Sequence, residues 1–337
     1  MRNRIKRLLS AASFIFIACF VAGPPNVWAN VEAPDNPEHA WRAQKASASL
    51  LLSVSGLNGQ EIWVAGERGH ILKRDDSDAW QQASVPTQVL LTAIDMFDDR
   101  YGWAVGHDAV ILKTMDGGSS WQEVYKNSDE QRPLLDVTFR DQQKGIAVGA
   151  YGYYLYTQDG GRTWGDKLVN EEHDFHLNAI SQSAGGELYI AGEAGSLYRS
   201  FDSGENWTTL VSPYEGSFFD VLAWGNDHVA VAGLRGHLYL SKDKGDNWRK
   251  IPSTVQTSLN SMIRLKNGQL LVVGHAGILL LVSADYTQTT VYQLPNRKAL
   301  ADAYEFKQNH VLLVGESGIR SLNLCDVFQR EVLSWCH

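Results

Sequence analysis

The residues best suited to chemistry in this sequence lie between Thr114 and Val124, in the stretch TMDGGSSWQEV. The stretch brings an aspartate, two glycines, two serines and a tryptophan together. A carboxylic acid beside hydroxyl groups and an aromatic ring could serve hydrolysis, as in glycosidases, where carboxyl groups act as acid, base or nucleophile. The same residue types could instead hold a turn in shape.

A second candidate for chemistry is the stretch NEEHDFH, which begins at Asn170. Its Glu171, Glu172, His173 and His176 are residue types that bind metal ions. A run of charged residues in a connection is more typical of a solvated loop, and we interpret the stretch in that way. The sequence has no phosphate-binding loop and no dinucleotide fingerprint. We therefore expect no metal and no cofactor.

The stretch around Asp116 has three relatives in register, TQDGGRTW, SFDSGENW and SKDKGDNW. All four read (Ser/Thr)-x-Asp-x-Gly-x-x-Trp, which resembles the Asp-box, or BNR repeat, of sialidases and other propellers. The aspartate can accept hydrogen bonds from its own turn, the glycine can take a positive φ, and the tryptophan can fold back into the sheet. A catalytic site is not normally repeated around one molecule, so we interpret the motif as structural. Its residues are Asp116, Gly118, Trp121, Asp159, Gly161, Trp164, Asp202, Gly204, Trp207, Asp243, Gly245 and Trp248.

A second pattern, Gly-x-x-Gly-x-(Ile/Leu), begins at Gly66, and seven copies start 40, 43, 43, 41, 41 and 41 residues apart. In one copy Ala109 replaces the second glycine. Both glycines are expected to supply a positive φ at the ends of a turn. Short apolar runs, such as LLSV ending at Val54, recur with the same spacing, and each unit predicts four short strands. Four-stranded units of ~40 to 45 residues are the blades of a β-propeller. The sequence predicts an all-β, seven-bladed propeller over residues 30–324.

The ring of blades must also be closed. Trp41 precedes Val54 by 13 residues, close to the 14 to 16 residues between each fourth-strand tryptophan and the next apolar run. This spacing favours WRAQKA, from Trp41, as an N-terminal strand that forms the outer strand of the seventh blade. The alternative is the C-terminal stretch SLNLCDVFQREV, in which Phe328 falls where the blade's own tryptophan would be.

Both ends of the chain carry signals of their own. Residues 1–29 combine a basic start, an apolar run and a small residue at Ala29, which predicts a signal peptide and an exported or periplasmic protein. Cys325 and Cys336 lie in a tail, residues 325–337. In an exported protein two nearby cysteines are expected to pair, with two free thiols as the alternative.

The charge of the chain excludes one class of partner. Removal of the signal peptide takes away four of 30 basic residues and none of 38 acidic ones, which changes the net charge from −8 to 26 − 38 = −12. A surface this acidic repels phosphate backbones, so we expect no nucleic-acid partner.

Binding by propellers favours the face that carries the turns between second and third strands. The residues after each leading glycine are rich in Glu and His, and could bind a cation or a charged partner loop. A set of solvated turns is the alternative. The candidate partner-binding residues are Glu67, Arg68, His107, Asp108, Tyr151, Glu193, Arg235, His275 and Glu316.

The sialidase resemblance implies catalytic groups that the sequence lacks. That family's early Phe/Tyr-Arg-Ile-Pro motif is absent, and FRDQ at Phe139 is the nearest string. No Ser-His-Asp elbow is visible either. We therefore expect no catalytic residues; a glycan-binding or sialidase-like glycosidase remains the alternative.

The units LLDVTFRDQQKGIAVGAYGYYLYTQDGGRTW and LTAIDMFDDRYGWAVGHDAVILKTMDGGSSW resemble blades of the photosystem II stability/assembly factor family. The similarity covers roughly residues 41–323. It implies an exported propeller that binds membrane-protein subunits during assembly, and bacterial relatives outside photosynthesis include proteins associated with exporters of the resistance-nodulation-division type. The photosynthetic members are marked by a basic patch, which this acidic chain lacks. We therefore predict a non-catalytic scaffold for a membrane or envelope protein complex, peripheral to the membrane.

Overall fold

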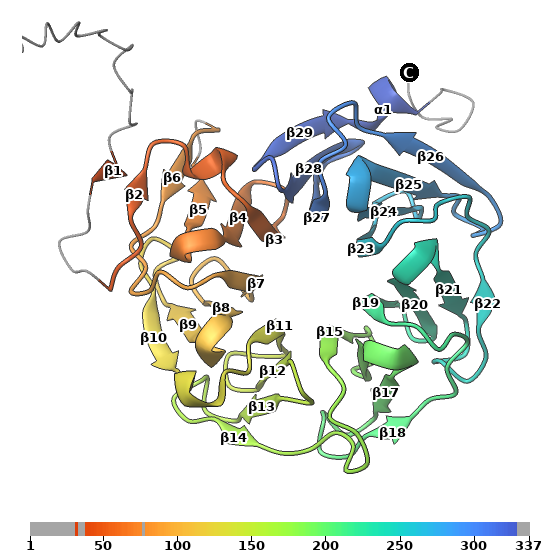
Figure 1. Ribbon diagram of the computed structural model, residues 1–337, viewed down its shortest axis with the longest axis horizontal. Helices are drawn as coiled ribbons and strands as arrows, with labels where there is room; N and C mark the ends of the chain where they lie inside the picture. The colour runs from red at the N-terminus through yellow and green to blue at the C-terminus, as the bar shows by residue number, and fades with distance from the viewer. Residues whose placement is uncertain (1–30, 33–37, 76–77, 329–337) are drawn as a thin grey trace, which may run out of the picture.

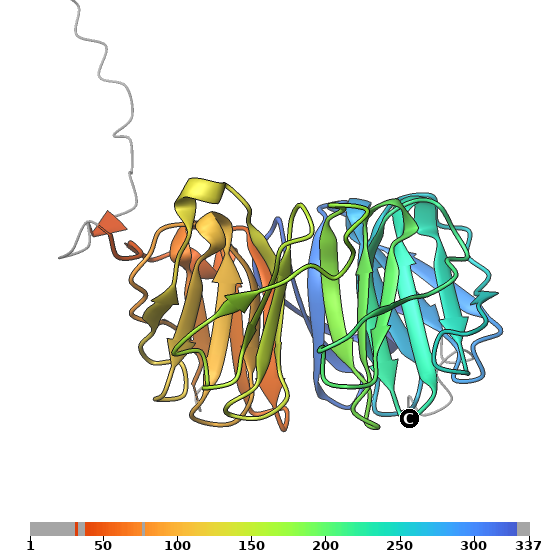
Figure 2. The ribbon, with the colours of Figure 1, turned by 90° about the horizontal axis from the view of Figure 1, so that it is seen from below.

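Seven β-sheets surround a central channel in the computed structural model of the protein, which describes residues 31–32, 38–75 and 78–328 (Figure 1). Seen from the side, the sheets form a disc with two faces (Figure 2). Six blades have four antiparallel strands, and the seventh has three strands among the described residues. The predicted all-β, seven-bladed propeller is confirmed.

Each blade runs in chain order from its inner strand, at the channel, to its outer strand. The first four blades consist of β3 (Leu51–Leu57), β4 (Glu61–Gly66), β5 (Ile71–Arg74) and β6 (Trp80–Gln82); β7 (Leu91–Met96), β8 (Gly102–Gly106), β9 (Ile111–Thr114) and β10 (Gln122–Tyr125); β11 (Leu134–Phe139), β12 (Gly145–Gly149), β13 (Tyr154–Thr157) and β14 (Gly165–Asp166); and β15 (Leu177–Gln182), β16 (Leu188–Gly192), β17 (Leu197–Ser200) and β18 (Thr208–Thr209).

The remaining three blades consist of β19 (Phe218–Trp224), β20 (His228–Gly233), β21 (Leu238–Ser241) and β22 (Arg249–Lys250); β23 (Leu259–Arg264), β24 (Leu270–Gly274), β25 (Ile278–Val282) and β26 (Thr289–Gln293); and β27 (Leu300–Lys307), β28 (His310–Gly315) and β29 (Arg320–Asn323). The described residues also contain the short helix α1 (Leu324–Val327) and the 3-10 turns η1 (Ala46–Ala48), η2 (Glu67–Gly69), η3 (His107–Ala109), η4 (Ser128–Glu130), η5 (Glu193–Gly195), η6 (Leu234–Gly236) and η7 (His275–Gly277).

The two glycines of the Gly-x-x-Gly turn have different functions. Gly66 has an extended backbone, with φ of −177°, so the predicted positive φ is wrong for the first glycine. A Cβ atom there would lie 2.2 Å from the carbonyl oxygen of Leu50, so close approach of the backbone requires glycine. Gly69 has φ of 70°, as predicted, and Arg68 before it is also left-handed, with φ of 56°. The turn thus holds a non-glycine residue in an uncommon conformation at the surface.

The Asp-boxes form the self-contained turns that the sequence predicts. Asp159 Oδ1 accepts hydrogen bonds from the N–H groups of Arg162 and Thr163, both at 2.9 Å, and Oδ2 accepts one from the Thr163 hydroxyl at 2.7 Å. These hydrogen bonds lower the pKa of Asp159 to about 2. Gly161 has φ of 83°. Corresponding hydrogen bonds within the turn are made by Asp116, Asp202 and Asp243.

The Asp-box turns also join neighbouring blades, which the sequence did not indicate. A backbone carbonyl just before the motif's glycine accepts a hydrogen bond from a side chain of the preceding blade. The bonds run from the Trp63 indole to Gly117 (2.9 Å), from the Lys113 ammonium to Gly160 (2.7 Å) and from the Arg199 guanidinium to Lys244 (2.7 Å). The tryptophans of the motif pack inward, and Trp121 is only 4% exposed.

Aspartates on the inner strands connect blades along the channel. Each carboxylate accepts a hydrogen bond from a backbone N–H group of the next blade, and burial of the carboxyl group raises its pKa, to about 6 for Asp95, about 8 for Asp136 and about 7 for Asp220. The acceptor and donor pairs are Asp95 and Phe139 (2.9 Å), Asp136 and Ile180 (2.8 Å), Asp220 and Met262 (2.6 Å), and Asp302 and Val54 (2.9 Å). The last pair joins the seventh blade to the first.

The predicted closure of the ring by an N-terminal strand is wrong. β2 (Arg42–Ala43) pairs with β1 (Val31–Glu32) and lies beside the first blade, where Gln82 Oε1 accepts a hydrogen bond from the Ala43 N–H at 3.0 Å. The reason is that the segment is held at the first blade, where the Trp41 carbonyl also accepts a hydrogen bond from the Gln82 side chain, at 2.7 Å. The turn that follows β2 then reaches the seventh blade, where the Ser47 carbonyl accepts a hydrogen bond from the Ile319 N–H at 2.8 Å.

The C-terminal alternative is described as far as Phe328, which is buried and packs its ring against Tyr292 of the sixth blade at 6.3 Å. Cys325 is disulfide-bonded. Its predicted partner, Cys336, lies outside the described residues, as does the predicted signal peptide, residues 1–29. The pairing and the cleavage near Ala29 stay predictions.

Replacement of Asp159 with alanine should lower the free energy of unfolding by about 1–2 kcal/mol, because the turn loses its acceptor. Urea denaturation at neutral pH measures the change. Asp166→Ala, an exposed position in the same blade, is the control and should change stability by less than about 0.5 kcal/mol. The stabilisation from Asp159 is present above its unfolded pKa of about 4 and is lost as the pH falls toward 2. Equal effects of the two variants would contradict the role of the motif.

Asp136→Asn tests the carboxyl groups along the channel. The folded protein holds a proton on Asp136 up to about pH 8, whereas the unfolded chain releases it near pH 4. The resulting stabilisation is complete below the unfolded pKa and is lost as the pH rises through the folded pKa. Asparagine keeps an oxygen acceptor for Ile180 but does not ionise, so the variant's stability should fall less than that of wild type as the pH rises through this range. Parallel stability curves from urea denaturation would contradict the prediction.

Candidate functional site

The nine predicted partner-binding residues lie in the turns between second and third strands, on one face of the disc that we call the turn face. Figure 1 looks onto this face. Glu67, Asp108 and Glu193 are half-buried. The exposed members of the set are Arg68, His107, Tyr151, Arg235, His275 and Glu316.

The structure brings two of these residues together, through a third that was not predicted with them. Tyr151, 52% exposed, packs edge-on against His176 with the ring centroids 4.9 Å apart. His176 Nδ1 lies 4.0 Å from Glu193 Oε2. The three side chains form a contiguous cluster across the third and fourth blades. Since they come from different loops, no local sequence signal joins them.

The half-buried glutamates also have a structural function. Glu193 Oε2 accepts a hydrogen bond from the His176 N–H, and Glu67 Oε1 accepts one from the Leu50 N–H, both at 3.3 Å. Each donor directly precedes the inner strand of a blade. The recurrence of glutamate after the leading glycine is therefore explained in part by capping of these strands.

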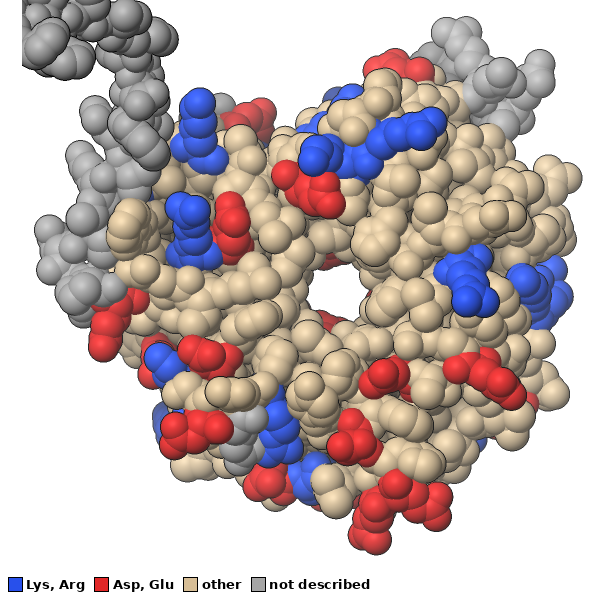
Figure 3. Space-filling model, viewed as in Figure 1, with Lys and Arg blue, Asp and Glu red and all other residues tan. Residues whose placement is uncertain are grey.

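The turn face carries both signs of charge. Figure 3 shows basic and acidic side chains interspersed around the open channel, with acidic atoms at its rim. Glu316, for example, is paired with Lys298 at 3.4 Å. In the stretch considered for metal binding, His173 stacks on Phe175 at 4.8 Å. No three His, Cys, Asp or Glu side chains within the described ranges are grouped so that they could hold a metal ion.

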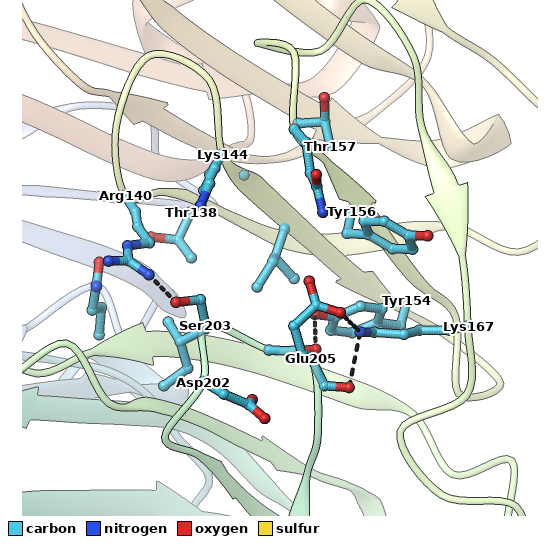
Figure 4. A pocket seen from close by; sticks show the side chains of 16 residues that line it. Thr138, Arg140, Lys144, Tyr154, Tyr156, Thr157, Lys167, Asp202, Ser203 and Glu205 are labelled. Atoms are coloured by element: carbon cyan, nitrogen blue, oxygen red, sulfur yellow. Dashed lines mark hydrogen bonds and ion pairs between the residues drawn. The ribbon is translucent and has the colours of Figure 1, made fainter.

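A pocket that the sequence did not indicate lies between the third and fourth blades, on the opposite face. It encloses about 140 Å³. We call it the seam pocket; Figure 4 shows Arg140 and Lys144 on one side of it, and Tyr156 and Lys167 on the other. Its walls come from the β11–β12 hairpin, β13, and the Asp-box turn of the fourth blade, residues 202–205.

The polar groups around the seam pocket are partly paired. Lys167 Nζ forms an ion pair with Glu205 at 3.5 Å and donates a hydrogen bond to the Glu205 carbonyl at 3.1 Å, and Arg140 donates one to the Ser203 hydroxyl. Hydrogen bonds from Asn206 lower the pKa of Asp202 to about 2, so this carboxyl is ionised at neutral pH. The pocket thus combines the ion pair of Lys167 and Glu205 with the cationic side chains of Arg140 and Lys144 on its other side.

The Asp-box carboxylates offer little for catalysis, because both oxygens of each are committed to their own turn. In the described part of the chain no helix is long and apolar enough to cross a bilayer.

Comparison with known proteins identifies the family. The model of the photosynthesis system II assembly factor YCF48 family matches residues 72–134 and 126–301. The photosystem II assembly lipoprotein Ycf48 of Prochlorococcus marinus (strain MIT 9312) is 37% identical over 150 residues, 43% of this chain and 44% of the relative. Ycf48 of Thermosynechococcus vestitus is 38% identical over 139 residues, 40% of this chain and 39% of the relative. The aligned region spans less than half the length of these relatives.

Solved structures agree on the architecture. The structure described as YCF48 bound to D1 peptide has a TM-score of 0.66 at 16% identity and covers 86% of this chain and 98% of that chain. Virginiamycin B lyase from Staphylococcus aureus has a TM-score of 0.71 at 10% identity, covering 81% and 94%. At such identities the similarity shows the fold alone. The family model, in contrast, matches more than half of the sequence, and this chain therefore belongs to the photosynthesis system II assembly factor YCF48 family.

Proposed function

We propose that this chain is a non-catalytic, exported propeller that binds a membrane-protein subunit and assists assembly or stability of its complex. The observation that carries the proposal is the cluster of Tyr151, His176 and Glu193 on the turn face. Exposed tyrosines with a fixed ring are frequent anchors of protein interfaces. The edge-on contact with His176 orders the Tyr151 ring before binding, which lowers the entropic cost of association.

The relatives support a membrane-protein client. Several are named photosystem II assembly lipoproteins, and one solved relative is described as bound to a D1 peptide. By analogy, the turn face of this chain would take an extended segment of its client. A photosystem complex and an exporter of the resistance-nodulation-division type are both client classes under this proposal. A glycan-binding or sialidase-like function has less support, because the Asp-box carboxylates are committed to their turns.

A pull-down from detergent-solubilised membranes of the native organism tests this proposal. The mature protein should recover a defined integral membrane protein, and mass spectrometry of the recovered subunits separates the two client classes. Tyr151→Ala should weaken the interaction by roughly thirtyfold, the effect of truncating an interface anchor worth about 2 kcal/mol. Met115→Ala, at a position 46% exposed in the Asp-box of the second blade, is the control and should bind as wild type does.

Recovery of the same client by Tyr151→Ala would exclude this cluster as the site. Recovery of no membrane protein, together with hydrolysis of a sialoside by the purified protein, would favour the glycosidase alternative.

A further inference from the structure

The seam between the third and fourth blades lacks a large side chain that fills the two preceding seams. Three residues before the leading glycine of the turn, the first and second blades carry Trp63 and Trp103, both fully buried. Trp63 reaches the next Asp-box and donates its hydrogen bond to Gly117 at 2.9 Å. Trp103 stacks on Phe139 with the ring centroids 3.4 Å apart. The third blade has Ile146 at this position. Tyr154 of the same blade reaches the Asp-box glycine Gly204 in its place, and the seam pocket lies beside these two side chains.

A second substitution at the same seam removes a connection across it. Lys113 in β9 spans the seam between the second and third blades to the Gly160 carbonyl at 2.7 Å. The equivalent residue in β13 is Tyr156, because Lys113 pairs with Trp103 in the second blade and Tyr156 pairs with Ile146 in the third. Tyr154 instead donates a hydrogen bond to the Gly204 carbonyl, at 3.2 Å. The two changes together account for the seam pocket.

The seam pocket has an apolar floor and a cationic rim. Ile146, Tyr154 and Leu188 on the floor are 6%, 1% and 1% exposed. On the rim, Lys144 is exposed, and among the described residues its ammonium group has no ion-pair or hydrogen-bond partner. Tyr156 offers a half-buried ring on the opposite side of the pocket. A ligand that suits both parts has a flat apolar group and a negative charge.

The size of the pocket decides the kind of ligand. Cofactors and metabolites occupy sites of about 300–1,000 Å³, whereas this pocket encloses about 140 Å³. We propose that the seam pocket receives one aromatic side chain of a partner protein, next to an acidic residue that pairs with Lys144. The ring would pack on the apolar floor formed by Ile146, Tyr154 and Leu188. The pocket lies on the face opposite to the turn face, so this second binding site is independent of the proposed function.

Two small probes test the chemistry directly. Indole-3-acetate carries the ring and the negative charge, whereas tryptamine carries the same ring and a positive charge. In NMR titrations of the isotope-labelled mature protein, indole-3-acetate should shift the amide signals of Gly204 and Glu205 with a Kd on the order of 1 mM, as expected for a ligand of this size. Tryptamine should bind at least about fivefold more weakly, because a surface charge contact is worth about 1 kcal/mol. Absence of saturable shifts, or equal binding of both probes, would overturn the proposal.

Substitutions locate the probe. Ile146→Trp should abolish binding of indole-3-acetate, because the new indole fills the pocket, while Ile146→Val should retain it. Lys144→Gln should weaken binding about fivefold and Lys144→Arg should restore it; this pair carries the test if Ile146→Trp does not fold. Tyr151→Ala on the turn face should leave probe binding unchanged. Undiminished binding by Ile146→Trp or Lys144→Gln would overturn the assignment.

Discussion

The whole structure depends on hydrogen bonds that cross from one blade to the next. A four-stranded sheet has two apolar faces and cannot bury both alone, so each blade is stable only between neighbours. Two sets of side-chain hydrogen bonds make the connection. Near the channel, aspartates such as Asp136 accept a backbone N–H group of the next blade; on the Asp-box face, a carbonyl such as that of Gly117 accepts a side chain of the preceding blade. Burial makes the carboxylates costly to ionise, and the raised pKa values record that cost.

The same type of bond closes the ring. Asp302 accepts the Val54 N–H, and the Tyr304 hydroxyl accepts the Gly59 N–H at 3.1 Å, so the seventh and first blades meet through their inner strands. Among the described residues, closure of the ring therefore involves no strand exchanged between the termini. β2 pairs instead with β1, beside the first blade.

Both proposed binding sites use positions that the repeat does not need. Both oxygens of each Asp-box carboxylate are bonded within the turn, whereas the left-handed residue of the Gly-x-x-Gly turn differs between blades, for example Arg68, Tyr151 and Ala194, which are all exposed. Seams can vary in the same way, because the inner-strand bonds hold adjacent blades together even where a large side chain is missing. The difference between Trp103 and Ile146 therefore changes the surface without changing the fold. A repeated scaffold of this kind can carry one site on the turn face and another at a seam.

The spacing of the glycine turns and the four Asp-box motifs was enough to predict seven blades and the structural role of Asp159, because strands, turns and their hydrogen bonds are formed by residues close in the chain. Contacts between blades were beyond such reasoning. Asp136 and Ile180 are 44 residues apart, and Tyr151, His176 and Glu193 come from separate loops. The N-terminal strand was misplaced because spacing along the chain does not show which blade a segment joins, and the hydrogen bonds of Trp41 and Ala43 with Gln82 place it at the first blade. The seam pocket depends on how completely side chains fill the space between two blades. That space is defined only once the blades are packed.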